Sequence, residues 1–248
     1  MWCGVGIKIV NFWRSLVSGP FGGHATLTDN LVSVWPISED GFDVHGTNDL
    51  TNNNTVTFVA KGAGAPANMP ANVANFVAAS SQNFTGTAVA AMTNNFTWAQ
   101  WINVGNATRW GLVNNGINAA PYGFTVEVSV FGAGDILVFA KSDGSDYAYT
   151  ATGVVTTDGS AWRLLIIAYD TTEPVAANKI RVYVNDVNKV VTPAVAAVAH
   201  TVGNFLGIGR RTTDRYYQGK MSSPMIWSRI LTAAERTDLY ASGDGLFY

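Results

Sequence analysis

The sequence contains one cysteine, few charged residues and no long apolar run. A single cysteine, Cys3, excludes an intramolecular disulfide and a cysteine-type metal site, so folding does not require an oxidising compartment. No apolar run reaches the length of about 18 residues that a membrane-spanning helix needs. Lysine and arginine form no cluster, which argues against the basic stripe expected of a nucleic-acid-binding protein.

What the sequence does contain points to a large β protein with an uncharged polar surface. Of its 248 residues, 48% are hydrophobic and 12% aromatic, with eight tryptophans, which is enough for a large core. Only 13% are charged and the net charge is -2, so Asn, Thr, Ser and Gly must form most of the surface. Such surfaces are typical of extracellular or particle-exposed β proteins, and this length suits one sandwich domain with an additional arm.

Beyond Leu27, short runs of alternating β-branched and aromatic residues are separated by Gly, Asn and Asp clusters, which predicts β-strands. The expected strands are Leu31–Pro36, Thr55–Val59, Ala74–Phe76, Phe96–Val104, Gly111–Val113, Phe124–Phe131, Ile136–Ser142, Tyr147–Thr152, Trp162–Tyr169, Lys179–Val184, Phe205–Arg210 and Gly219–Ser228. So many short strands predict a sandwich or a barrel. Strand alternation places six large aromatic residues in the core: Trp35, Trp98, Trp101, Trp162, Tyr183 and Trp227.

One helix is expected near the end of the chain. Thr232 and Glu235 have the spacing of a capping box, in which the threonine hydroxyl and the glutamate side chain satisfy each other's backbone N–H groups. Leu239 and Tyr240 give this helix an apolar side, and Gly243 can end it.

Residues 1–28 form a separate N-terminal arm in this interpretation, and residues 29–248 form the sandwich. Lys8, Asn11 and Arg14 break the pattern of a secretory signal, so we expect none. An apolar arm needs a surface to pack on, either its own sandwich or a neighbouring subunit. The residues expected to dock are Trp2, Ile7, Ile9, Phe12, Trp13 and Leu16.

The region Asp29–Tyr248 resembles the laminin-G-like, concanavalin A-like jelly-roll family. The resemblance is carried, in the family's order, by the segments LVSVWPISED, NFTWAQWINV, SAWRLLIIAYD, KIRVYVNDV, FLGIGRR and YYQGKMSSPMIWSRILTAAERTDLY. It implies an all-β fold of two antiparallel jelly-roll sheets with one short C-terminal helix, beside the N-terminal arm. Two positions depart from the family pattern: Ser222-Ser223 replaces an Asp-Glu pair, and Leu164-Leu165 replaces a His-His pair.

Catalysis is not expected. Glycosidases of this fold use a Glu-x-Asp-x-x-Glu strand to place two carboxylates around the scissile bond, but Glu127 stands alone among valines. The three histidines, His24, His45 and His200, are scattered, and no Gly-x-Ser-x-Gly motif occurs. No cofactor is therefore required.

Calcium is the best metal candidate, because Glu39, Asp40, Asp43 and Asn48 supply oxygen atoms within one loop. The resemblance implies a structural calcium near this loop, with Asp40 and Asp43 as ligands. Alternatively, the two aspartates accept backbone N–H groups and shape the turn. Because Ser222 and Ser223 replace acids, we favour the second interpretation.

Glycan binding is the role that the resemblance implies. A sugar site needs exposed aromatic faces together with polar groups. The aromatic candidates in the predicted loops are Trp110, Tyr122, Tyr147, Tyr149, Tyr216 and Tyr217.

The sequence therefore favours a non-catalytic structural protein on a virion surface, a phage head-decoration or tail-associated protein. Its arm would dock on capsid or tail subunits, and its sandwich would adhere to cell-surface glycan. Sheet edges and the apolar arm favour a homo-oligomer. One alternative is a secreted, extracellular bacterial carbohydrate-binding adhesin, and a less favoured one is a glycoside hydrolase.

Overall fold

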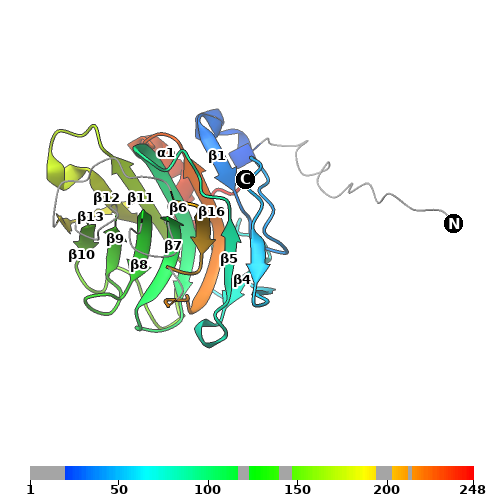
Figure 1. The fold of residues 1–248 in the computed structure, drawn as a ribbon. Helices are drawn as coiled ribbons and strands as arrows, with labels where there is room; N and C mark the ends of the chain where they lie inside the picture. Colours follow the sequence, from blue (N-terminus) through cyan, green and yellow to red (C-terminus); the bar gives the residue numbers. More distant parts are fainter. Residues whose placement is uncertain (1–19, 117–122, 140–146, 194–202, 212–213) are drawn as a thin grey trace.

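A computed structural model describes residues 20–116, 123–139, 147–193, 203–211 and 214–248, in which two antiparallel sheets pack face to face (Figure 1). Sheet A contains β1 (Leu31–Val34), β3 (Thr57–Ala60), β4 (Asn72–Phe76), β6 (Asn95–Val104), β11 (Arg163–Asp170), β12 (Ile180–Val184), β13 (Val187–Lys189) and β16 (Gly219–Trp227). Sheet B contains β2 (Thr51–Asn53), β5 (Asn83–Gly86), β7 (Trp110–Gly116), β8 (Phe124–Val128), β9 (Ile136–Phe139), β10 (Tyr147–Thr150), β14 (Val191–Pro193) and β15 (Phe205–Ile208).

The strand order shows that the chain crosses repeatedly between the sheets. Sheet A runs β13-β12-β11-β6-β16-β4-β3, with β1 also paired to β16, and sheet B runs β14-β10-β9-β8-β7-β15-β5-β2. The predicted two-sheet antiparallel sandwich is confirmed. Each expected strand overlaps an observed one, but β2, β5, β13 and β14 were missed. Polar stretches such as Thr51–Asn53 lack the apolar alternation that marks a half-buried strand.

The main core lies between the two sheets. On β6, Phe96, Trp98 and Ile102 point inward, and on the paired β11 Leu165 and Ile167 do the same. All five side chains are at most 1% exposed. Burial of this kind supplies the dominant favourable term in folding, about 1.5–3 kcal/mol for each large apolar side chain.

A second hydrophobic cluster covers the outer face of sheet A. The six aromatic residues predicted to be buried are buried, but four of them belong to this second cluster: Trp101, Trp162, Tyr183 and Trp227. They lie beneath the C-terminal segment and two 3-10 turns, η1 (Pro20–Gly23) and η2 (Ala25–Thr28), which contribute Leu239, Phe21 and Leu27. Sheet A is therefore buried on both faces.

The predicted C-terminal helix is present as α1 (Ala233–Tyr240), and both halves of its capping box form. It ends at Ala241, which adopts a left-handed conformation before the turn η5 (Ala241–Gly243), so Gly243 lies beyond the end expected for it. The remaining short turns are η3 (Ala78–Ser80) and η4 (Ala176–Asn178). Among the described residues, no helix has the length and apolar character needed to cross a membrane.

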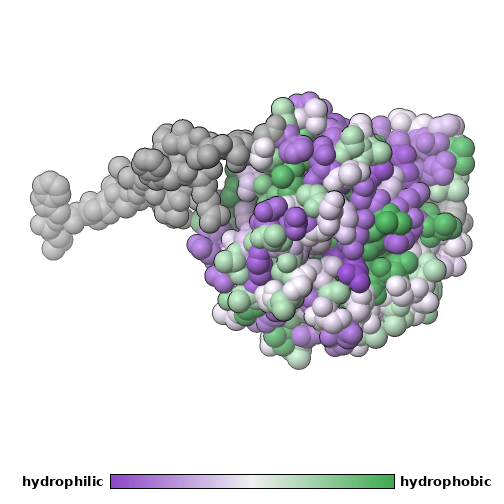
Figure 2. Space-filling model, turned by 180° about the vertical axis from the view of Figure 1, so that it is seen from behind, coloured by the Kyte–Doolittle hydropathy of each residue, from purple (hydrophilic) through white to green (hydrophobic). Residues whose placement is uncertain are grey.

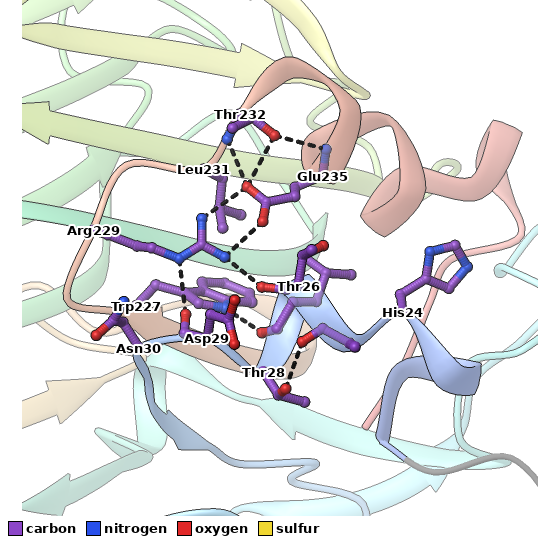
Figure 3. A network of polar contacts seen from close by, with 12 residues as sticks. His24, Thr26, Thr28, Asp29, Asn30, Trp227, Arg229, Leu231, Thr232 and Glu235 are labelled. Carbon is purple, nitrogen blue, oxygen red and sulfur yellow. Dashed lines mark hydrogen bonds and ion pairs between the residues drawn. The ribbon is translucent and has the colours of Figure 1, made fainter.

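Arg229 ties α1 to the start of the sandwich (Figure 3). Its guanidinium forms a two-pronged ion pair with Glu235, both contacts at 2.7 Å, and also donates to the carbonyl oxygens of Thr26 and Asp29. Beside it, Trp227 Nε1 donates to the Leu27 carbonyl at 2.7 Å. One arginine thus joins the helix cap to η2.

The surface is mostly polar, as the composition predicts. Figure 2 shows the molecule from behind relative to Figure 1, with hydrophilic and neutral residues predominating and hydrophobic residues gathered in small areas. Among the described residues, the most exposed large hydrophobic side chains are Val190 at 89% and Phe131 at 59%.

Candidate functional site

The outer face of sheet B differs from that of sheet A. In the described part of the chain, the two hydrophobic clusters lie between the sheets and on the outer face of sheet A. On β8, Val126 and Val128 point into the inter-sheet core, so Glu127 points outward. The same alternation on β9 turns Phe139 outward, next to the core residue Val138.

Four aromatic side chains gather on this outer face, and we call Phe131, Phe139, Tyr147 and Tyr149 the aromatic group. Ala148 is buried in the core, so β10 turns Tyr147 and Tyr149 outward with ring centroids 6.2 Å apart. Phe131 lies 4.7 Å from Tyr149, and Phe139 lies 5.9 Å from Tyr147. The group forms a partly exposed apolar platform.

Asp135 holds the loop that carries Phe131. Its side chain is fully buried, and its carboxylate accepts backbone N–H groups from Val130, Phe131 and Gly132 at 2.7–3.1 Å. Ser129 supports the same turn, because its hydroxyl accepts the N–H of Gly134 at 3.0 Å. These bonds fix the backbone of the loop from which the exposed Phe131 ring projects.

Beside the aromatic group, three arginines surround Glu127, and we call Arg109, Arg211, Arg215 and Glu127 the arginine cluster. Arg109 Nε donates to Glu127 Oε2, Arg211 Nε lies 3.2 Å from Oε1, and Arg215 Nε lies 4.0 Å from Oε2. The Glu127 side chain is 0% exposed, whereas those of Arg109 and Arg215 are 27% and 31% exposed. The carboxylate therefore lies beneath its arginines.

Gly111 allows this arrangement. It pairs with Glu127 across the β7–β8 ladder, and the segment that carries Arg211 and Arg215 crosses directly above it. A Cβ atom on Gly111 would lie 2.2 Å from the Arg211 nitrogen and 2.8 Å from the Arg215 carbonyl oxygen. Asn114 holds the same segment by donating from Nδ2 to the Arg211 carbonyl.

The two groups form one continuous surface, because the Arg211 guanidinium lies 5.7 Å from the centre of the Phe139 ring. Aromatic faces pack against apolar surfaces, and guanidinium groups donate several hydrogen bonds. By contrast, Glu127 is buried and ion-paired, so its carboxylate cannot reach a ligand on the surface. The arrangement supports binding, because the carboxylate at its centre, Glu127, is 0% exposed and cannot flank a substrate as the carboxylates of glycoside hydrolysis do.

The structure places the aromatic residues that were predicted to contact glycan in different parts of the molecule. Tyr147 and Tyr149 come together on sheet B, although in a strand and not a loop. Trp110 is half-buried against the core and donates to Asn106, and Tyr216 is half-buried in a bridge with Arg210. Tyr122 lies outside the described residues.

Tyr217 requires a correction. It was expected in a loop at the surface, but it is 0% exposed and packs against Phe76 with ring centroids 5.8 Å apart. Burial also raises the pKa of its phenol well above the ordinary value. Because no water-exposed surface remains, Tyr217 cannot contact a glycan.

Sequence reasoning missed Phe131, Phe139 and all three arginines of the site. Phe131 and Phe139 fell inside predicted strands, where no signal separates an outward aromatic residue from a core one. The nearby pair Arg210-Arg211 could have served as a signal, because adjacent arginines in a sequence this poor in charge are unusual.

In the candidate calcium loop, the aspartate carboxylates accept hydrogen bonds from nearby backbone N–H groups. Asp43 Oδ1 accepts the N–H groups of Val34, His45 and Gly46, and Oδ2 accepts that of Asn48. Partial burial raises the pKa of Asp43, but hydrogen bonds from the backbone and from the Ser33 side chain outweigh burial and hold the pKa below its ordinary value. Asp40 accepts the N–H of Phe42 at 3.0 Å.

These bonds shape the loop and use both oxygens of Asp43. In the part of the chain that the structure describes, no three His, Cys, Asp or Glu side chains gather as metal ligands. Ser222 and Ser223, which replace the family's acids, lie where the register between β6 and β16 shifts, with their hydroxyl oxygens 3.1 Å apart.

The predicted arm divides into two parts. Trp2, Ile7, Ile9, Phe12, Trp13 and Leu16 lie outside the described residues. Of residues 20–28, Phe21 and Leu27 are fully buried in the second hydrophobic cluster, so this part packs on its own sandwich.

Known proteins provide an independent comparison. A family model described as the concanavalin A-like lectin/glucanases superfamily matches residues 77–235. Domain 4 of an extracellular arabinanase from Geobacillus stearothermophilus, in complex with arabinotriose, has a similar structure, with a TM-score of 0.61 and 15% sequence identity. That match covers 84% of this chain and 97% of that one. No curated protein matches the sequence.

Two binding domains of botulinum neurotoxins are also similar. For the domain of neurotoxin DC in complex with SialylT, the TM-score is 0.57 and the identity 12%. For the domain of serotype D the values are 0.62 and 11%. The matches cover 86% and 87% of this chain but only 52% of each neurotoxin chain. At these identities the likeness shows a shared fold.

Proposed function

Because this chain belongs to the concanavalin A-like lectin/glucanases superfamily, we propose that it binds carbohydrate without transforming it, through the outer face of sheet B. The observation that carries the proposal is the continuous surface formed by the aromatic group and the arginine cluster. Sugar rings present apolar C–H faces that pack on aromatic rings, while their hydroxyls accept hydrogen bonds from groups such as guanidinium. The arabinanase domain, whose structure contains arabinotriose, supports a sugar-binding use of this fold.

The absence of catalysis belongs to the same proposal. Glu127 is the carboxylate at the centre of the site, and it is buried beneath three arginines. A general acid or nucleophile must reach the glycosidic oxygen or carbon, and a second carboxylate must lie on the other side of the bond. Glu127 does not meet the first condition, because its side chain is 0% exposed.

Substitution of Tyr149 tests the proposal. Tyr149→Ala removes the ring that contacts both Phe131 and Tyr147, so we expect binding to a positive glycan from an array screen to weaken about tenfold, the size of one aromatic contact. Phe42→Ala is the matched control, because this ring is 44% exposed but lies in the loop between β1 and β2. Equal titration curves for wild type and Tyr149→Ala would contradict the proposed site.

We further propose that the sandwich is carried on a virion surface, as a head-decoration or tail-associated protein. The apolar arm residues Trp2, Phe12 and Trp13 would dock on capsid or tail subunits, and homo-oligomer formation would complete the attachment. Support comes from the apolar arm and the polar, weakly charged surface. The secreted adhesin remains the alternative.

Deletion of residues 1–19 distinguishes the virion proposal from the secreted adhesin, because it removes the proposed docking residues and keeps the buried Phe21. The virion proposal predicts particles that lack the truncated protein while the protein still folds and binds glycan. Particles that incorporate it normally would rule out docking through the arm.

A further inference from the structure

We infer that the aromatic group binds the interior of a single polysaccharide chain, with consecutive sugar units packed on neighbouring rings, and not the terminal sugar of a glycan. This assignment rests on the proposed function and names the part of the glycan that is recognised. It follows from the number of rings in contact, from their exposure and from the angles between them.

The aromatic rings form one surface that is larger than a single sugar. Tyr147 pairs across the sheet with Phe139, and their ring centroids lie 5.9 Å apart. Tyr149 follows on the same face of β10, 6.2 Å from Tyr147, and Phe131 lies 4.7 Å from Tyr149. A sugar ring is about the size of one aromatic ring, so a terminal sugar would leave most of this surface uncovered. Consecutive sugar units would cover it.

The aromatic group is a platform, and it does not enclose its ligand. The Phe131 side chain is 59% exposed, and Tyr147 and Tyr149 are half-buried. Pockets for small ligands bury about 70–90% of the ligand surface, whereas a sugar packed on this platform keeps its opposite face in water. One aromatic contact changes an affinity by only about fivefold, so strong binding requires several sugar units.

The rings are not coplanar. The planes of Tyr147 and Tyr149 differ by 32°, those of Phe131 and Tyr149 by 53°, and those of Phe139 and Tyr147 by 58°. The flat face of a crystalline polysaccharide could pack on one of these planes at a time. A single chain can turn from one sugar unit to the next about its glycosidic bonds. The angles therefore favour a single, twisted chain.

The turn that carries Phe131 is fixed in place by the segment beside it. Gly134 has a φ of +74°, and a Cβ atom there would lie 2.1 Å from the Val155 carbonyl oxygen. The Val155 N–H donates to the Gly134 carbonyl at 3.1 Å, and the Asp135 carboxylate accepts three N–H groups of the same turn. A fixed turn reduces the entropy lost on binding, which matters where each contact is weak.

A length series tests the assignment by isothermal titration on the full chain. The probes are xylo-, cello-, malto-, manno- and arabino-oligosaccharides of two to six units. In at least one series we expect affinity to rise about tenfold or more between two and five units and then to level off, because each added unit reaches another ring until all are covered. Opening the reducing-end ring of the five-unit probe with borohydride should change its affinity less than about twofold, because the chain end makes no ring contact.

One variant assigns the length dependence to the rings. Phe131→Ala should weaken binding of the five-unit probe about fivefold and that of the two-unit probe less than about twofold, because two units can still pack on the remaining rings. Phe42→Ala, which changes an exposed ring between β1 and β2, should leave the series unchanged. Thermal unfolding verifies that each variant folds.

A second variant tests the connection between Phe139 and Tyr147. Residues 140–146 lie outside the described residues and include Lys141, Asp143 and Asp146. Packing of a sugar on aromatic rings does not require these charges, so the triple variant K141Q/D143N/D146N should keep the length dependence of the wild type. If the triple variant loses it, the ligand is held by residues 140–146 and the assignment to the rings is overturned.

The remaining outcomes separate this assignment from the proposed function. Affinity that is independent of length, or that is lost when the reducing-end ring is opened, shows recognition of a terminal sugar and leaves carbohydrate binding standing. Binding to microcrystalline cellulose that Phe131→Ala abolishes would also overturn the single chain. Binding to none of the oligosaccharides overturns the assignment, and a blank glycan array in addition overturns the proposed function.

Discussion

Gly111 shows how much of the site depends on one residue without a side chain. The segment with Arg211 and Arg215 crosses so close above β7 that any Cβ atom at position 111 would collide with its backbone. The sequence offers no sign of this, because a glycine next to a tryptophan in a short strand reads as a weak strand position. The close approach becomes visible only when two distant segments are placed together.

Gly111→Ala should therefore disturb both stability and binding. The added methyl group would lie 2.2 Å from the Arg211 nitrogen, and overpacking of this kind costs about 1–3 kcal/mol. Urea unfolding measures the loss. Gly105→Ala serves as the control, because its nearest contact would be 3.2 Å away. If both variants unfold at the same urea concentration, the crossing does not constrain position 111.

At the scale of elements, α1 is held by a network of hydrogen bonds and an ion pair that the sequence predicts only in part. The capping box of Thr232 and Glu235 was predictable, since it depends on two residues three positions apart. The ion pair from Arg229 to Glu235 and its bonds to Thr26 and Asp29 were not, because η2 lies at the other end of the chain (Figure 3).

This network predicts a dependence of stability on pH. Hydrogen bonds from Arg229 lower the pKa of Glu235 from 4.5 to about 2 in the folded protein. Because the folded-state pKa is the lower one, the stabilisation is complete above pH 4.5 and is lost as the pH falls through about 2. Its size is on the order of 2–3 kcal/mol.

Unfolding by urea between pH 7 and pH 2 measures this effect. Glu235→Gln should be less stable than wild type near neutral pH and should lose less stability on acidification. Asp244→Asn, an exposed change near the end of the chain, should follow the wild-type curve. A Glu235→Gln protein with the full wild-type pH dependence would show that other groups dominate acid unfolding.

At the scale of the whole molecule, the two sheets have different surroundings. Sheet A is covered on its outer face by segments from both ends of the described chain, and Figure 1 places the C-terminus beside β1. Tyr248 packs against Phe21 with ring centroids 5.5 Å apart and against His45 at 5.4 Å. The outer face of sheet B carries the aromatic group and the arginine cluster instead.

Two deletions measure where the sandwich begins. Removal of residues 1–19 keeps Phe21 and Leu27, whereas removal of residues 1–28 takes both from the second cluster. The longer deletion should cost roughly 3–6 kcal/mol more, from the burial of two large apolar side chains. Melting temperatures compared by calorimetry give the result. Equal melting temperatures would show that η1 and η2 do not stabilise sheet A.

The sequence by itself determined the class of fold, most strand positions, the start of α1 and the polar surface. These features depend on patterns between neighbouring residues, such as alternation in β11 or the Thr232–Glu235 spacing, and such patterns act locally. It could not decide which buried aromatic residues lie between the sheets, as Trp98 does, and which lie outside sheet A, as Trp101 does. Both faces of that sheet are apolar, so alternation does not distinguish them.

Only the tertiary structure decided the composition of the candidate site. Arg109, Glu127 and Arg211 belong to three separate segments, and Tyr217, which is close to Arg211 in sequence, is buried on the opposite side of the sheet. Whether an aromatic or charged residue faces ligand or core depends on which face of the sheet is covered. That choice is made by long-range strand pairing and by the segments packed on sheet A, and short-range sequence patterns do not encode it.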